Sequence, residues 1–166
     1  MKTEMPFYKF VTMFMTGLIF TGCCIFLYSD YIPNLVESDL FKSINLINTG
    51  LTVIITVSLF SVVYEIGYII NRIGFLMGNI LKAIKAIPFN KDYKKFNEKE
   101  KEFPTINILA REYSLTRTSM TLFLVMTVVA CFYLKWIFAI VMFLLSVLFF
   151  FSMRGHAKKI VKLMED

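Results

Sequence analysis

The chain has 166 residues, of which 57% are apolar and 18 are phenylalanines, and its formal net charge is +6. A water-soluble core of this size cannot bury so much apolar surface, so the composition excludes an ordinary soluble domain. Long apolar runs also alternate with segments rich in Lys and Arg. The sequence therefore predicts an all-α, polytopic membrane protein with four transmembrane helices.

The first predicted span covers about residues 7–28, and no charged residue lies between 10 and 27. A basic start before an apolar run is also typical of a secretory signal, and residues 20–23 approximate a lipoprotein cleavage site. The match is incomplete, because Phe20 stands where Leu is usual and apolar sequence continues through residues 24–28. We therefore predict that this segment is retained as a span.

The second predicted span covers about residues 51–70, and its helical pattern continues beyond the membrane. Apolar residues recur at helical spacing until Pro88 stops the helix: Ile73, Leu76, Met77, Ile80, Ile84 and Ile87. Lys82 and Lys85 lie off this stripe, where they can meet anionic lipid headgroups or a partner. The stripe itself has two open interpretations, contact with the membrane or packing on this chain or a second copy.

One face of the same helix carries Gly67, Asn71, Gly74 and Gly78, at steps of four, three and four residues. Such a ridge allows two helix backbones to approach closely, and Gly74 with Gly78 forms a GxxxG spacing. We therefore predict helix packing on this face. The sequence leaves open whether the partner helix belongs to the same chain or to another subunit.

Glu65 is the one acidic residue inside a predicted span. A charge at the bilayer centre costs about 2.5–3.5 kcal/mol on insertion scales, so this carboxylate needs a partner, a proton or water. Arg72 lies two turns further along, and Arg117 opens the third span at a comparable depth. We expect an intramembrane Glu65–Arg117 charge pair, and the alternative is an ion or proton site.

Residues 72–117 are predicted to form a cytoplasmic helical extension and loop. Residues 89–104 mix both charges with aromatic side chains, which is typical of a solvated loop, and the acidic members weaken any attraction for nucleic acid. We therefore expect no direct nucleic-acid contact. Thr105, after Pro104, is expected to cap a helix, and the arms 72–87 and 105–117 are expected to pack as an antiparallel pair.

Residues 120–153 are interrupted by a single charge, Lys135. As one helix this stretch would measure ~51 Å, well beyond a ~30 Å hydrocarbon core. Tyr133, Lys135 and Trp136 are residue types typical of the membrane interface. We therefore predict two spans, at about 118–134 and 137–153, joined by a tight turn.

Lys and Arg set the predicted orientation. The 29–50 connection holds one of them, whereas the 71–117 connection holds ten and the basic tail at 154–166 holds four. The positive-inside rule then predicts that both chain ends face the cytoplasm. We expect a multi-pass protein of the cell inner (cytoplasmic) membrane. Lys158 and Lys159 in the tail are candidate contacts for anionic lipid or a partner.

Residue patterns for catalysis and metal binding are missing from the sequence. Cys23, Cys24 and Cys131 lie inside predicted spans without metal-ligand spacing, and His156 is the single histidine. No Walker loop, HExxH or GxSxG is present. We therefore expect no enzymatic activity, no catalytic residues, no metal site and no cofactor.

The plan of the whole chain, four short spans with a basic cytoplasmic hairpin, resembles the small membrane subunits of bacterial anti-phage systems. The membrane component of Kiwa and some holin-like proteins share this outline. The resemblance implies a homo-oligomer that receives a soluble cytoplasmic partner or signal and responds by altering the membrane. Two other classes stay open: a small transporter or ion or proton channel centred on Glu65, and a membrane-embedded lipid enzyme.

Overall fold

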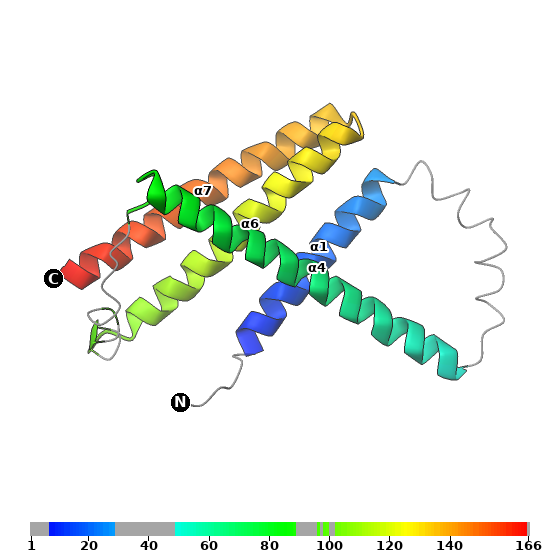
Figure 1. Ribbon diagram of the computed structural model, residues 1–166, viewed down its shortest axis with the longest axis horizontal. Coiled ribbons are helices and arrows are strands. Elements are labelled where there is room, and N and C mark those ends of the chain that lie inside the picture. Colours follow the sequence, from blue (N-terminus) through cyan, green and yellow to red (C-terminus); the bar gives the residue numbers. More distant parts are fainter. Residues whose placement is uncertain (1–6, 29–48, 89–95, 97, 100–101, 166) are drawn as a thin grey trace.

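The computed structural model describes residues 7–28, 49–88, 96, 98–99 and 102–165. Four long helices lie within these ranges: α1 (Phe7–Leu27), α4 (Thr49–Ala83), α6 (Thr105–Phe132) and α7 (Trp136–Glu165) (Figure 1). All four are long and apolar enough to cross a membrane. The predicted all-α class is thus confirmed for the described residues, as is the prediction of four helices long and apolar enough to cross a membrane.

Three of the helices continue beyond the predicted ends of their spans. α4 runs on to Ala83, α6 joins residues 105–117 to the third span, and α7 continues to Glu165. At ~1.5 Å per residue, the 35 residues of α4 measure ~52 Å, which exceeds a ~30 Å hydrocarbon core. Each of these helices therefore joins an apolar segment to a more polar one without a break.

α6 and α7 form an antiparallel hairpin, which is the most extensive helix pair of the described chain (Figure 1). Two apolar cores lie along it. The core nearer the hairpin turn contains Leu27, Ile70, Leu122, Met126, Ala130, Ala139 and Met142. The core at the other end contains Ile87, Met120, Met153 and Ala157. We call this other end, where α6 starts and α7 finishes, the basic end, because Arg111, Arg117, Arg154, Lys158, Lys159 and Lys162 lie there.

α1 and α4 cross at Gly17 and Gly67, near the middle of the molecule (Figure 1). A Cβ atom on Gly17 would overlap the Val63 carbonyl oxygen, and one on Gly67 would overlap the Met13 carbonyl oxygen. Each glycine therefore receives the backbone of the other helix, an approach that any side chain would block. The first half of α4, which precedes Gly67, contacts α1 alone among the described helices. Its residues Val57, Leu59 and Phe60 are exposed.

The ends of α4 and α6 both reverse through a residue with positive φ, Lys85 (φ 58°) and Leu134 (φ 54°). In each turn the next amide donates to the carbonyl five residues earlier, Ala86 to Leu81 at 2.9 Å and Lys135 to Ala130 at 3.1 Å. These bonds satisfy carbonyls that the helix end leaves free. The first turn ends α4 before residue 87, earlier than the stripe predicted.

Ile87 is completely buried by this reversal, because the turn directs it back into the core at the basic end.

A second local difference concerns the start of α6. Thr105 is its first helical residue rather than its cap, since Pro104 stands at the N-cap position and no side chain caps the helix there. Proline suits this position because it has no amide hydrogen to satisfy.

Candidate functional site

A polar pocket of about 290 Å³ lies between α1, α4 and α6, on the basic-end side of the Gly17–Gly67 crossing. From the two glycines toward the basic end, α1 and α4 diverge and leave a wedge-shaped space between them. Residues of α6 line its third side. The walls come from α1 (Tyr8, Lys9, Thr12 and Met13), α4 (Tyr68, Asn71 and Arg72) and α6 (Ser114, Arg117 and Thr118). Polar side chains thus gather where three helices meet.

Hydrogen bonds between helices hold the pocket walls together. The buried Thr118 hydroxyl of α6 donates to Asn71 Oδ1 of α4 at 2.9 Å. The Tyr8 hydroxyl of α1 donates to the backbone carbonyl of Arg111 on α6 at 2.8 Å. The first bond is partly buried and the second is exposed, and together they connect α6 to both α4 and α1.

Three cations line the pocket, Lys9, Arg72 and Arg117. Arg72 Nε donates to the Tyr68 hydroxyl at 2.8 Å, and its guanidinium lies over the Tyr68 ring. Within the described part of the chain, none of the three forms an ion pair with an acidic side chain. The pocket therefore carries positive charge that the described residues leave uncompensated.

Arg117 is the most enclosed of these cations. Its guanidinium lies 5.5 Å from the centre of the Phe75 ring, and its Nε is buried without a hydrogen-bond partner. The one hydrogen bond that its guanidinium makes within the described chain joins a terminal nitrogen to Ser114 Oγ at 3.5 Å, which is long for such a bond. A guanidinium has five donors, so most of its hydrogen-bonding capacity is unused here.

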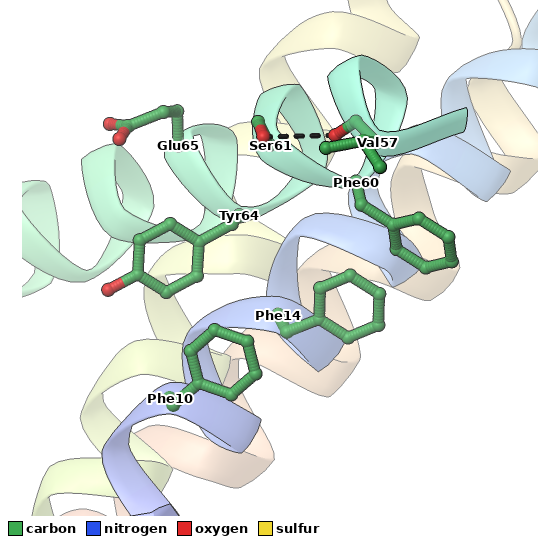
Figure 2. A pocket seen from close by; sticks show the side chains of 7 residues that line it. All are labelled: Phe10, Phe14, Val57, Phe60, Ser61, Tyr64 and Glu65. Carbon is green, nitrogen blue, oxygen red and sulfur yellow. Dashed lines mark hydrogen bonds between the residues drawn. The ribbon is translucent and has the colours of Figure 1, made fainter. Parts of the chain in front are cut away.

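Glu65 lies on a different face of α4 from this pocket. It borders a second, more apolar pocket of about 570 Å³, which Phe10, Phe14, Val57, Phe60, Ser61 and Tyr64 also line. Figure 2 shows the Glu65 carboxylate directed away from the aromatic rings. Those rings stack between the two helices, with centroids 5.3 Å apart for Phe10 and Tyr64 and 5.5 Å apart for Phe14 and Phe60.

The structure does not bring Glu65 and Arg117 together. Glu65 is exposed and has no hydrogen bond or ion pair within the described residues, and Arg72 contacts Tyr68 instead. The reason is helical geometry: Glu65 precedes Gly67 by two positions, which puts it on roughly the opposite side of α4 from the ridge. Similar depth along two helices is therefore not sufficient for the expected pair.

The ridge residues all contact other helices of the same chain. Gly67 meets α1, and Asn71 accepts the hydrogen bond from Thr118. A Cβ on Gly74 would lie 3.0 Å from Thr121 Oγ1, and one on Gly78 would lie 3.0 Å from Arg117 Cδ, both on α6. Of the two possibilities that the sequence left open, the structure therefore shows the contact within one chain.

The candidate lysine contacts differ in their surroundings. Lys82 is partly buried and its ammonium lies 5.6 Å from the centre of the Tyr113 ring on α6. Lys85, Lys158 and Lys159 are exposed. Lys82 follows Gly78 by four positions, so it continues the ridge toward α6 instead of facing outward with the other three.

His156 also has a neighbour that the sequence did not indicate. Its Nδ1 lies 3.1 Å from Glu112 Oε2 on α6, a distance that allows an ion pair when the imidazole is protonated. Nδ1 is buried and has no hydrogen-bond partner, so this contact does not count as a hydrogen bond. The contact joins α6 to α7 at the basic end.

Several contributors to the pocket region were missed by sequence reasoning, among them Gly17, Lys9, Tyr8 and Thr118. Gly17 with Thr21 has the spacing of small residues that allows helices to pack, a signal that was available in the first span. Lys9 gave no specific signal, since one lysine at the start of a span is common.

Comparison of the chain with family models, curated proteins and solved structures finds no match.

Proposed function

We propose that this protein is a non-enzymatic membrane subunit that couples a cytoplasmic partner or signal to the membrane. In this proposal it lies in a bacterial inner membrane with both chain ends in the cytoplasm, and it works as a homo-oligomer. The basic end then faces the cytoplasm, as the positive-inside rule requires of the segments richest in Lys and Arg.

The observation that carries the proposal is the continuity of α4, α6 and α7. Each is a single helix that contains both a membrane-length apolar segment and an extension at its basic end. The core around Met153 and Ile87 ties these extensions together. Because packed helices move as units, a displacement applied to the extensions reaches the membrane segments without passing through a hinge.

The exposed lysines supply a surface for the partner. Lys85, Lys158 and Lys159 are unshielded at the basic end, where they can attract an acidic protein surface or anionic lipid. The whole-chain resemblance to membrane subunits of anti-phage systems makes phage infection the first signal to test. A change in membrane permeability is the response that this proposal predicts.

The decisive test weakens the continuity of α4 without removing buried contacts. Leu76 and Ile80 are exposed on its extension, so a Leu76→Gly/Ile80→Gly variant loses helix propensity, about 1 kcal/mol per site relative to alanine, with little loss of packing. Cells expressing this variant should show a smaller phage-triggered uptake of a membrane-impermeant dye than cells expressing the unaltered chain. The matched Leu76→Ala/Ile80→Ala variant should respond normally.

Native mass measurement in mild detergent tests the assembly. The proposal expects several copies per particle for the unaltered chain and for both variants. A monomer in detergent and in lipid nanodiscs, together with unchanged permeability in infected cells, would contradict the coupling role.

A second candidate is favoured by Glu65. This carboxylate is exposed on a membrane-length helix and has no described partner, a costly state that transport of a proton or cation would explain. Liposomes containing the protein would then show cation or proton flux that Glu65→Gln abolishes. Flux that persists in the Glu65→Gln variant, or no flux at all, would remove this candidate.

A further inference from the structure

We propose that the polar pocket between α1, α4 and α6 binds a phosphate group, carried by an anionic phospholipid or by a soluble phosphate. This inference concerns a pocket between three helices, which is separate from the lysines Lys85, Lys158 and Lys159 of the basic end. It does not depend on the coupling role, because it requires only the three helices and their observed packing.

The first argument is the donor set. Arg72 and Arg117 present planar guanidinium groups to one pocket, and Lys9 adds an ammonium group. Guanidinium forks match the oxygen geometry of phosphate, and a charge-assisted hydrogen bond of this kind is roughly twice as strong as a neutral one. Arg117 belongs to the pocket lining, and its buried Nε has no hydrogen-bond partner, so this guanidinium is left with an unsatisfied donor.

The second argument is charge balance. Two described acidic side chains of the same helices serve other surfaces, Glu65 on the opposite side of α4 and Glu112 of α6 against His156. Three cations without an acidic counterpart among the described residues repel one another, and the repulsion is strongest for a partly enclosed group such as Arg117. A bound anion removes this repulsion and so stabilises the junction of the three helices.

The third argument is position along the spans. Arg72 stands just after the apolar run that ends at residue 70, and Arg117 stands just before the run that begins at residue 118. Lys9 lies in the first turn of α1. All three therefore lie at the level where a bilayer presents its phosphate groups, and the N-terminal end of α1 adds positive potential there.

The experiment uses the full chain, purified in detergent and stripped of lipid. Phosphatidylglycerol, phosphatidylcholine and inorganic phosphate are titrated separately, and binding is followed by native mass spectrometry and by the shift in unfolding temperature. We expect phosphatidylglycerol to bind and to raise the unfolding temperature. Arg117→Gln and Arg72→Gln should each weaken this binding about tenfold to a hundredfold, the effect of losing a charge-assisted hydrogen bond.

Two further variants separate the site from general effects. Lys162→Gln removes one positive charge from an exposed position on α7 and should leave binding unchanged. Arg117→Lys keeps the charge but loses the fork, so its affinity should lie between those of the unaltered chain and Arg117→Gln. This conservative variant also keeps the test informative if Arg117→Gln fails to fold.

The three titrations distinguish the sources of the phosphate. Saturation by phosphatidylglycerol alone supports a lipid site, and an equal shift with inorganic phosphate supports a site for soluble phosphate. Equal binding of phosphatidylcholine and phosphatidylglycerol that none of the arginine variants alters would overturn the proposal, as would equal losses in Lys162→Gln and Arg117→Gln.

Discussion

Gly17 and Gly67 determine how the two helices beside the polar pocket approach each other. The contact is reciprocal: the Val63 carbonyl lies where a Gly17 side chain would begin, and the Met13 carbonyl lies where a Gly67 side chain would begin. Both obstacles are backbone atoms, so no rotamer change can relieve an added Cβ. The wedge that forms the pocket starts at this crossing and depends on its geometry.

Substitution of Gly17 by alanine should therefore separate α1 from α4. Overpacking of a close contact costs about 1–3 kcal/mol, and we expect the upper part of this range because backbone atoms must move. Thermal unfolding of the purified protein, followed by the fluorescence of Trp136, measures the loss of stability.

Gly22→Ala is the matched control on the same helix. A Cβ at Gly22 meets nothing within 4 Å, so this variant should unfold at the temperature of the unaltered chain or slightly above it. Equal unfolding temperatures for Gly17→Ala and Gly22→Ala would contradict the close approach of α1 and α4 at Gly17.

Among the elements, the sequence predicted those features that repeat at short range. Hydropathy located four spans, the residue types at Tyr133 and Trp136 located the α6–α7 turn, and glycine spacing identified the packing face of α4. The partner of the glycine ridge was not predictable in this way, because such a ridge describes a shape without specifying which helix fits it. The polar pocket joins Lys9, Arg72 and Arg117 from three distant segments, and no local pattern links them.

The tight turn between α6 and α7 permits a prediction about helix ends. Leu134 adopts a left-handed conformation, which costs a residue with a Cβ about 1–2 kcal/mol, and its side chain is 71% exposed. Leu134→Gly should relieve this strain while losing little packing. After the greater chain entropy of glycine is subtracted, we expect a gain of about 0.5–1 kcal/mol in thermal unfolding.

Leu134→Ala provides the control for that prediction. Alanine removes most of the side chain but keeps the Cβ that causes the strain, so its stability should not rise. A gain of the same size in both variants would mean that loss of the exposed leucine, rather than relief of the backbone, produces the effect.

For the whole molecule, orientation connects the charge pattern to the proposed role. The starts of α1 and α6 and the end of α7 point toward the same end of the fold (Figure 1). An even number of crossings is the arrangement that places both chain ends on one side of a membrane. Because ten Lys and Arg residues occupy 71–117 and one occupies 29–50, the free energy of insertion favours the cytoplasm for the basic end.

Cysteine labelling on intact cells tests this orientation. The three native cysteines are first replaced by alanine, and single cysteines are then introduced as Ser43→Cys in the 29–50 connection and Lys159→Cys on the exposed surface of α7. A membrane-impermeant maleimide should label position 43 in intact cells and position 159 only after the membrane is opened. The reverse pattern would invert the molecule, and labelling of both positions would require an odd number of crossings. Either result would place the exposed lysines of α7 outside the cell, beyond reach of a cytoplasmic partner, and would therefore exclude these lysines as its docking surface.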